Sequence, residues 1–316
     1  ASVASVRRYL RKFLGDPRIV EMPRMLWLFI LNCMVLPFRA SRSADRYRKI
    51  WTSEGSPLAV HTARICEGIA GRLASEGLNV RVLPAQCYGT PSVKEQMDLL
   101  SGKGIDKILV VPLFPQYSPQ TVGAAMDAVA RYLLARRSPP AVRSIKRFYD
   151  RHGWADAIAA QVQASWRKKG VPEAGKSRLV FSFHGIPEAC VSIKGDTYRQ
   201  ECEESARLVA QALGIPTEAW EVTFQSRFGP AAWLQPYTSD RMRALGRAGI
   251  ERIDILCPSF ACDCLETCEE IEIDAKADYL SENPSGLFNY IPCINASSEA
   301  VAFYADLVKE ELQGWI

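Results

Sequence analysis

This 316-residue sequence has few of the features of a membrane-spanning, nucleotide-dependent or nucleic-acid-binding protein. Its most apolar stretch, residues 25–38, is shorter than the roughly 20 residues that a membrane-spanning helix needs. No Gly-x-Gly-x-x-Gly or Walker pattern follows a strand-like segment, which counts against a dinucleotide or nucleotide enzyme. The net charge of +4, without a cluster of basic and aromatic residues, gives no reason to expect nucleic acid as a partner.

Cysteine is abundant, with ten residues, and no signal-peptide pattern accompanies them. We expect free thiols or metal ligands, because disulfide frameworks are typical of small secreted proteins. The sequence therefore predicts a cytoplasmic protein.

Residues 25–38 (MLWLFILNCMVLPF) allow two interpretations. They form either a buried helix or an apolar lip that holds an apolar substrate or dips into the inner face of a membrane. Arg39, Arg42 and Arg46 would lie at the edge of such a lip.

Strand-like apolar runs alternate with helix-like segments through most of the chain. Strands are expected over residues 79–83, 107–113, 178–183, 219–225 and 252–257. Helices are expected over residues 92–101, 121–136, 198–213 and 240–248, and from Asp263 onward. This alternation indicates right-handed βαβ units and parallel sheets, and two such sets predict two domains, residues 1–145 and 146–295.

Ligands of open α/β sheets bind beyond the carboxyl ends of the strands. The polar segments at these ends are residues 114–118, 184–187, 226–233 and 258–266, and we expect them to face one cleft. Among the three histidines only His184 ends a strand, so it is either a base or metal ligand or a satisfied, partly buried side chain.

Four acidic residues follow the strand at 252–257. On a regular helix Asp263, Glu266, Glu270 and Asp274 would form one stripe, in which like charges repel. They need a bound cation or a solvated face, and both interpretations stay open because the helix dipole also favours acidic residues in a first turn.

Insertion of a metal ion into a porphyrin would use both features, because two pyrrole protons must leave as the ion arrives. Four segments resemble signature blocks of the ferrochelatase family. They are FPQYSPQTVGAAM (114–126), SFHGIPEACVSIKGDTYRQEC (182–202), TFQSRFGPAAWLQPYT (223–238) and CPSFACDCLETCEEIEID (257–274). The likeness extends over essentially the whole chain.

The resemblance implies two similar Rossmann-like domains with parallel sheets flanked by helices and a porphyrin cleft between them. A C-terminal helix in 296–316 would complete the first domain. The implied reaction inserts Fe²⁺, as a substrate, into protoporphyrin IX in the terminal step of haem biosynthesis. Alternatives are a coproporphyrin or cobalt chelatase of the same fold, or a non-catalytic tetrapyrrole-binding protein.

The resemblance also implies roles for single residues. It makes His184 and Glu266 the catalytic pair, and it adds Glu270 and Asp274 to them as metal ligands. The porphyrin-binding residues would be Tyr88, Tyr117, Ser118, Gln225, Trp233 and Phe260.

Two departures from the family pattern concern residue 87 and the family's first strand. Cys87 stands where many members have an arginine, and the family's usual first strand has no counterpart in this sequence. Some members carry a [2Fe–2S] cluster. Pro119 excludes the animal-type ligand arrangement, so a cluster here would use the internal cysteines, with Cys293 as a substitute for one. The candidate ligands are Cys257, Cys262, Cys264 and Cys268.

Overall fold

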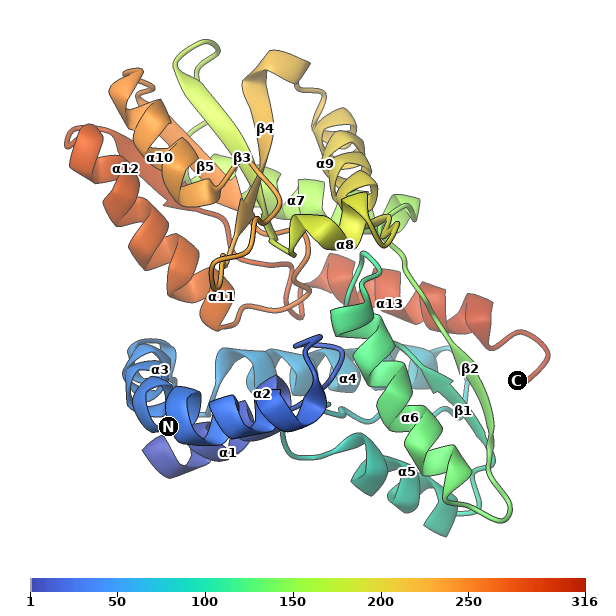
Figure 1. Cartoon of the computed structure of the whole chain (residues 1–316). Helices are drawn as coiled ribbons and strands as arrows, with labels where there is room; N and C mark the ends of the chain where they lie inside the picture. The colour runs from blue at the N-terminus through green and yellow to red at the C-terminus, as the bar shows by residue number, and fades with distance from the viewer. Residues whose placement is uncertain (1) are drawn as a thin grey trace. The chain divides into compact units, whose positions relative to one another are not determined.

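The computed structural model describes residues 2–316, apart from the side chain of His152. The chain forms two compact units, each assembled from segments that are distant in the sequence (Figure 1). Unit 1 contains the residues up to Pro112, then Tyr117–Lys146 and Tyr304–Ile316. Unit 2 consists of Leu113–Gln116 and Arg147–Phe303.

Unit 1 is mostly helical. Its helices are α1 (Val3–Leu14), α2 (Arg24–Ile30), α3 (Leu36–Ile50), α4 (Pro57–Ser75), α5 (Val93–Gly102) and α6 (Ala124–Leu134), with π-helical turns η1 (Leu31–Val35) and η2 (Pro119–Gly123). Strands β1 (Lys107–Val110) and β2 (Ala141–Ser144) pair in parallel. β1 covers only the first part of the strand predicted over 107–113.

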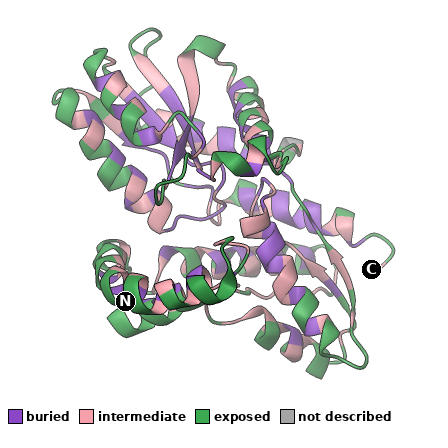
Figure 2. Ribbon diagram, viewed as in Figure 1, coloured by how far each residue is buried: buried purple, intermediate pink, exposed green. Residues whose placement is uncertain are grey.

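The first helices of unit 1 share a core. α1 turns Val6, Leu10 and Leu14 inward at intervals of four residues, the spacing of one helix face. Leu31 and Leu36, from the continuous helical stretch formed by α2, η1 and α3, belong to the same buried cluster. The outward face of α2 stays largely exposed (Figure 2).

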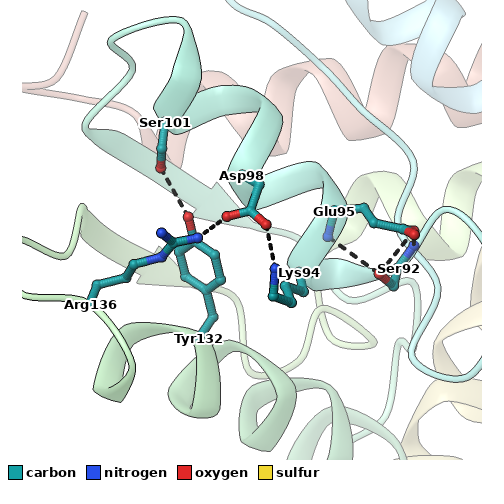
Figure 3. A network of polar contacts seen from close by, with 7 residues as sticks. All are labelled: Ser92, Lys94, Glu95, Asp98, Ser101, Tyr132 and Arg136. Atoms are coloured by element: carbon teal, nitrogen blue, oxygen red, sulfur yellow. Dashed lines mark hydrogen bonds and ion pairs between the residues drawn. The ribbon is translucent and has the colours of Figure 1, made fainter.

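Figure 3 shows how α5 begins and how it is tied to α6. The hydroxyl of Ser92 accepts a hydrogen bond from the backbone N–H of Glu95, whose carboxylate accepts one from the backbone N–H of Ser92. This reciprocal cap fixes the helix start. Asp98 pairs with Arg136, which follows α6. The helix predicted over 92–101 is thus confirmed.

The strand predicted over residues 79–83 is wrong. This segment carries no strand pairing in the described chain, although it is rich in β-branched and apolar residues. Strand formation requires backbone groups on a neighbouring strand, and propensity alone does not supply them.

The end of the chain belongs to unit 1. Helix α13 (Ser298–Glu311) begins among the residues of unit 2, and its part from Tyr304 onward is assigned to unit 1. Arg143 in β2 donates to the carbonyl oxygens of Glu311 and Gln313, at 2.7 and 2.9 Å. Its guanidinium also lies 4.2 Å from the ring centroid of Trp315.

Unit 2 contains a four-stranded parallel sheet in the order β4-β3-β5-β6. The strands are β3 (Ser177–His184), β4 (Trp220–Gln225), β5 (Arg252–Leu256) and β6 (Leu287–Tyr290). The helices are α7 (His152–Lys169), α8 (Glu188–Ser192), α9 (Tyr198–Leu213), α10 (Thr238–Arg247), α11 (Leu265–Cys268) and α12 (Lys276–Glu282), with short turns η3 (Thr217–Ala219) and η4 (Glu270–Ala275).

The core of unit 2 explains why these strands were predictable. Leu179–Phe183 in β3 and Ile253–Leu256 in β5 are buried, so each is a near-continuous apolar run of the kind found inside parallel sheets. The strands predicted over 178–183, 219–225 and 252–257 are confirmed, as is the helix over 198–213.

Candidate active site

The candidate site lies at the carboxyl edge of the sheet in unit 2, where the strand order reverses. β4 pairs with one side of β3 and β5 with the other, so a crevice is expected beyond the ends of β3 and β5. His184 is the last residue of β3, and the segment that carries Glu266 follows β5. His184 therefore ends one of the two strands that flank this reversal, and Glu266 lies in α11, which follows the other.

Hydrogen bonds determine which ring nitrogen of His184 carries the proton, and they hold its backbone in place. Its Nδ1 lies 2.7 Å from the carbonyl oxygen of Gly185, and because a carbonyl only accepts, Nδ1 carries the proton in the neutral ring. Nε2 then keeps a lone pair that can take a proton or bind a metal ion. The backbone of His184 is held as well: its N–H donates to Ser259 and its carbonyl oxygen accepts from Tyr198 at 2.9 Å.

Gly185 permits a close approach between the ends of β3 and β4. A Cβ atom at this position would lie 2.8 Å from the carbonyl oxygen of Gln225 and 3.2 Å from the ring of Trp233. The residue after His184 must therefore be glycine if the two strand ends are to keep this spacing.

Gln225 anchors Glu266. Its side-chain amide donates to the carbonyl oxygen of Glu266 at 2.7 Å, and its own oxygen accepts from Ser182 at 2.7 Å. Ser182, Gln225 and Glu266 all belong to unit 2. The amide of Gln225 thus holds the backbone of Glu266, the residue that carries the carboxylate. The porphyrin contact expected for Gln225 stays a prediction.

Glu270 is the most constrained of the acidic residues. Its two carboxylate oxygens accept from the backbone N–H and the hydroxyl of Ser226, both at 2.6 Å. Burial raises the pKa of the Glu270 carboxyl, while the Ser226 hydrogen bonds and the positive charge that His184 has when doubly protonated oppose this rise. The pKa also responds to the charge of Glu266. His184, Glu266 and Glu270 thus interact electrostatically.

The acidic stripe continues to Asp274 through a π-helical turn, in which the backbone N–H of Asp274 donates to the carbonyl oxygen of Glu269. Glu266 and Glu270 are half-buried, whereas Asp274 is exposed. Among the side chains that the structure describes, no group of three or more His, Cys, Asp or Glu is poised to hold a metal ion. The stripe is therefore not a preformed, closed coordination shell.

Asp263 does not belong to this stripe, and that part of the prediction is wrong. It lies before α11 and is buried, where its carboxylate accepts from Tyr290, Thr267, Asn295 and the backbone N–H of Cys293. These donors satisfy the charge inside the protein. Asp263 ties the start of α11 to the segment that follows β6.

Aromatic residues in unit 2 lie close to His184. The ring centroid of Phe260 is 6.3 Å from that of the imidazole, and Trp233 packs against Gly185. The indole N–H of Trp233 is buried and finds no partner in the described protein. Both side chains lie beside the end of β3, and the porphyrin contacts that the resemblance implies for them stay predictions.

The remaining porphyrin-binding candidates belong to unit 1. Tyr88 donates to Asp16 at 3.1 Å, and burial, followed by the charge of Asp16, raises the pKa of its phenol. The ring of Tyr117 lies 4.6 Å from the ammonium of Lys146. Ser118 is buried and caps the turn η2. These three roles stay predictions.

Sequence reasoning placed Ser226 in the strand-end segment 226–233 without giving it a role, and it missed Tyr198 as part of the site. Both lie in segments that resemble the family, but a hydroxyl that contacts a backbone carbonyl or a carboxylate leaves no periodic signal. A serine directly after a strand end is the one available hint.

Comparison with known proteins gives the family. The family model for ferrochelatases matches residues 1–312. The chain belongs to the ferrochelatase family. It is 43% identical over 316 residues to a ferrochelatase of Aromatoleum aromaticum and 44% identical over 315 residues to one of an Azoarcus species. Each alignment spans 100% of this chain and 85% of the relative.

This ferrochelatase is accordingly an enzyme of haem biosynthesis that inserts a metal ion into a porphyrin. Solved structures agree on the fold: SirB from Bacillus subtilis with Fe³⁺ has a TM-score of 0.56 at 16% identity, covering 81% of this chain and 92% of that one. The predicted α/β class, with parallel sheets flanked by helices, is confirmed.

Proposed function

We propose that this ferrochelatase inserts Fe²⁺ into protoporphyrin IX, with His184 and Glu266 accepting the two pyrrole protons. The observation that carries the proposal is the bond from His184 Nδ1 to the Gly185 carbonyl, which leaves Nε2 as a base. Two protons leave the ring for each Fe²⁺ that enters, so the exchange leaves the net charge of the porphyrin unchanged. A neutral imidazole and a carboxylate can accept one proton each.

The acidic residues give Fe²⁺ a route. Asp274 is exposed, Glu270 is half-buried and Glu266 is closest along the chain to the end of β5. Oxygen ligands bind divalent ions, and an ion that must be passed on is best held by a few ligands at a time. The open arrangement of these carboxylates supports capture and transfer better than permanent binding.

An anaerobic insertion assay tests the substrate. Fe²⁺ is offered with protoporphyrin IX or coproporphyrin, and Co²⁺ is offered in place of Fe²⁺. We expect the largest kcat/KM for Fe²⁺ with protoporphyrin IX, in keeping with the apolar residues 25–38. A preference for coproporphyrin or Co²⁺ would favour a chelatase of different specificity, and binding without turnover would favour a tetrapyrrole carrier.

We further propose that residues 25–38 contact a membrane surface, with the remainder of the protein in the cytoplasm. Five large apolar side chains there are exposed by half or more, among them Met25 by 83%, Phe29 by 65% and Phe38 by 73%. This exposure argues against the purely buried helix. Arginines at Arg24 and Arg42 are also exposed and can meet anionic head groups.

The full helix Arg24–Ile50 is, by length and composition, long and apolar enough to cross a membrane. Its inward residues Trp27, Leu31 and Leu36 are nevertheless buried in the core shared with α1. A helix that lends one face to a protein core and exposes the other suits the plane of a membrane surface. Peripheral contact is therefore our proposal.

Replacement of both Phe29 and Phe38 with serine is expected to reduce co-sedimentation with anionic liposomes severalfold. Because both rings are exposed, the melting temperature of this double variant should stay near that of the wild type. Trp27→Ser is the matched control. Its ring is buried, so this variant should lose several degrees of melting temperature. Unchanged liposome binding by the double variant, or a large loss of its stability, would contradict the proposal.

We infer that the cysteines act as thiols and do not hold an iron–sulfur cluster. Cys257, Cys264 and Cys293 are buried, and desolvation raises the pKa of each thiol, with acidic neighbours adding to the rise. A [2Fe–2S] cluster needs four converging thiolates, whereas no ligating group of three is assembled in the described residues. The candidate ligand set from the sequence does not fit as observed.

Anaerobically purified protein is accordingly expected to be colourless and free of sulfide, with ten thiols reacting with a chromogenic disulfide after denaturation. Visible absorption and thiol titration measure this. A reddish-brown protein whose bands vanish in Cys262→Ser or Cys268→Ser would establish a cluster instead. Haem formation by the enzyme is independent of either result.

A further inference from the structure

Ser226, directly after β4, has an uncommon backbone conformation. Its φ of 66° lies in the left-handed region, which side chains with a Cβ rarely adopt. Asn295 is the one other non-glycine residue with a positive φ in the part of the chain that the structure describes. A strained serine persists where its surroundings determine its conformation, and such positions cluster at functional sites.

The backbone N–H and the hydroxyl of Ser226 both donate to the carboxylate of Glu270. The backbone N–H lies 2.6 Å from Oε1 of Glu270, and the hydroxyl lies 2.6 Å from Oε2. The left-handed backbone lets the N–H and the side chain address the same carboxylate. Glycine would adopt this φ without strain but would lose the hydroxyl.

The neighbouring residue makes a parallel contact. Gln225 pairs with His184 across the sheet and holds the carbonyl oxygen of Glu266. Two consecutive residues at the end of β4 therefore fix two carboxylate-bearing positions, Glu266 through its backbone and Glu270 through its side chain.

We propose that Ser226 is a positioning residue for iron capture, which locks the Glu270 carboxylate in the orientation that receives Fe²⁺. The inference rests on the proposed route of Fe²⁺ over the acidic residues. Each carboxylate oxygen has about two acceptor sites, and Ser226 uses one on each, so the others stay available in a fixed direction. Without the hydroxyl, Oε2 can turn away.

Two substitutions separate this role from folding. Ser226→Ala and Ser226→Gly both remove the hydroxyl, and a hydrogen bond to a charged group corresponds to about a 10- to 100-fold change in affinity. We expect the KM for Fe²⁺ and the dissociation constant of Fe²⁺ to rise by about tenfold or more, with kcat and porphyrin affinity near wild type. Ser226→Gly should melt at least as high as Ser226→Ala, because glycine relieves the strain.

A double-substitution cycle gives the decisive test. Fe²⁺ binding to the porphyrin-free protein is measured by anaerobic calorimetry, and Ser226→Ala is expected to add nothing in a Glu270→Ala background. Ser281→Ala, at an exposed serine of α12, serves as the control. Additive effects of Ser226→Ala and Glu270→Ala, or wild-type Fe²⁺ affinity in Ser226→Gly, would overturn the inference. Absent insertion activity would refute the proposed function alone, since calorimetry still reports on Ser226 and Glu270.

Discussion

His184→Ala is expected to lower kcat for iron insertion by about 10²- to 10⁴-fold, the usual contribution of a positioned acid–base group. Removal of the ring removes Nε2, the acceptor that the bond to Gly185 leaves free. Porphyrin affinity should stay near wild type, because the ring of the substrate is expected to be held mainly by aromatic side chains such as Phe260 and Trp233. Porphyrin fluorescence titration and a stopped anaerobic assay measure the two quantities separately.

His61→Ala is the control for this experiment. His61 lies in α4 of unit 1 and is no part of the candidate site, so its replacement should leave kcat unchanged. If His184→Ala retained a substantial fraction of wild-type turnover, the assignment of His184 to proton transfer would be lost.

Glu266→Gln is expected to be almost inactive even at saturating Fe²⁺, whereas Glu270→Gln and Asp274→Asn should mainly raise the KM for Fe²⁺. The amide of glutamine cannot accept a proton near neutral pH, although it keeps the shape of the side chain. Glu270 and Asp274 lie farther along the helix, where on the proposed route they would meet the ion before it reaches the ring. Steady-state kinetics with Fe²⁺ as the varied substrate distinguish the two classes of effect.

Glu272→Gln provides the control, since Glu272 is an exposed acidic residue on the same turn that was not assigned a role in the iron path. Equal losses of kcat in Glu266→Gln, Glu270→Gln and Asp274→Asn would contradict a graded path. Such a result would instead favour one shared coordination shell that operates only in the loaded enzyme.

Sequence patterns predicted secondary structure most reliably where a strand is buried on both faces of the sheet or where buried residues recur at a strict interval. The central strands β3 and β5 are buried on both faces, which produces apolar runs that few other structures would tolerate. Residues 79–83 also contain valine and leucine but form no strand pairing, because pairing depends on a neighbouring strand and not on the segment itself. Long-range contacts of this kind are invisible in a local window.

At the site, the sequence predicted the residue types and misjudged some of the geometry. Asp263 was assigned to the acidic stripe because a helix was assumed to start there, whereas α11 begins at Leu265 and leaves Asp263 buried among donors. The conformation of Ser226 could not be predicted, since a positive φ in a non-glycine residue arises from its tertiary partners. The pattern of strands placed the segments of His184 and Glu266 beyond strand ends, whereas their catalytic roles were implied by the resemblance and stay predictions.

The assignment of Tyr304–Ile316 to unit 1 has a consequence for the order in which the protein is completed during synthesis. Unit 2 is contiguous apart from Leu113–Gln116, so nearly all its contacts become available once residue 303 has been added. The contacts of Arg143 with Glu311, Gln313 and Trp315 can form only after residues 311–315 have been synthesised. The half that is translated first is therefore the last to acquire its full set of native contacts, and it must wait in a partly exposed state for its closing segment.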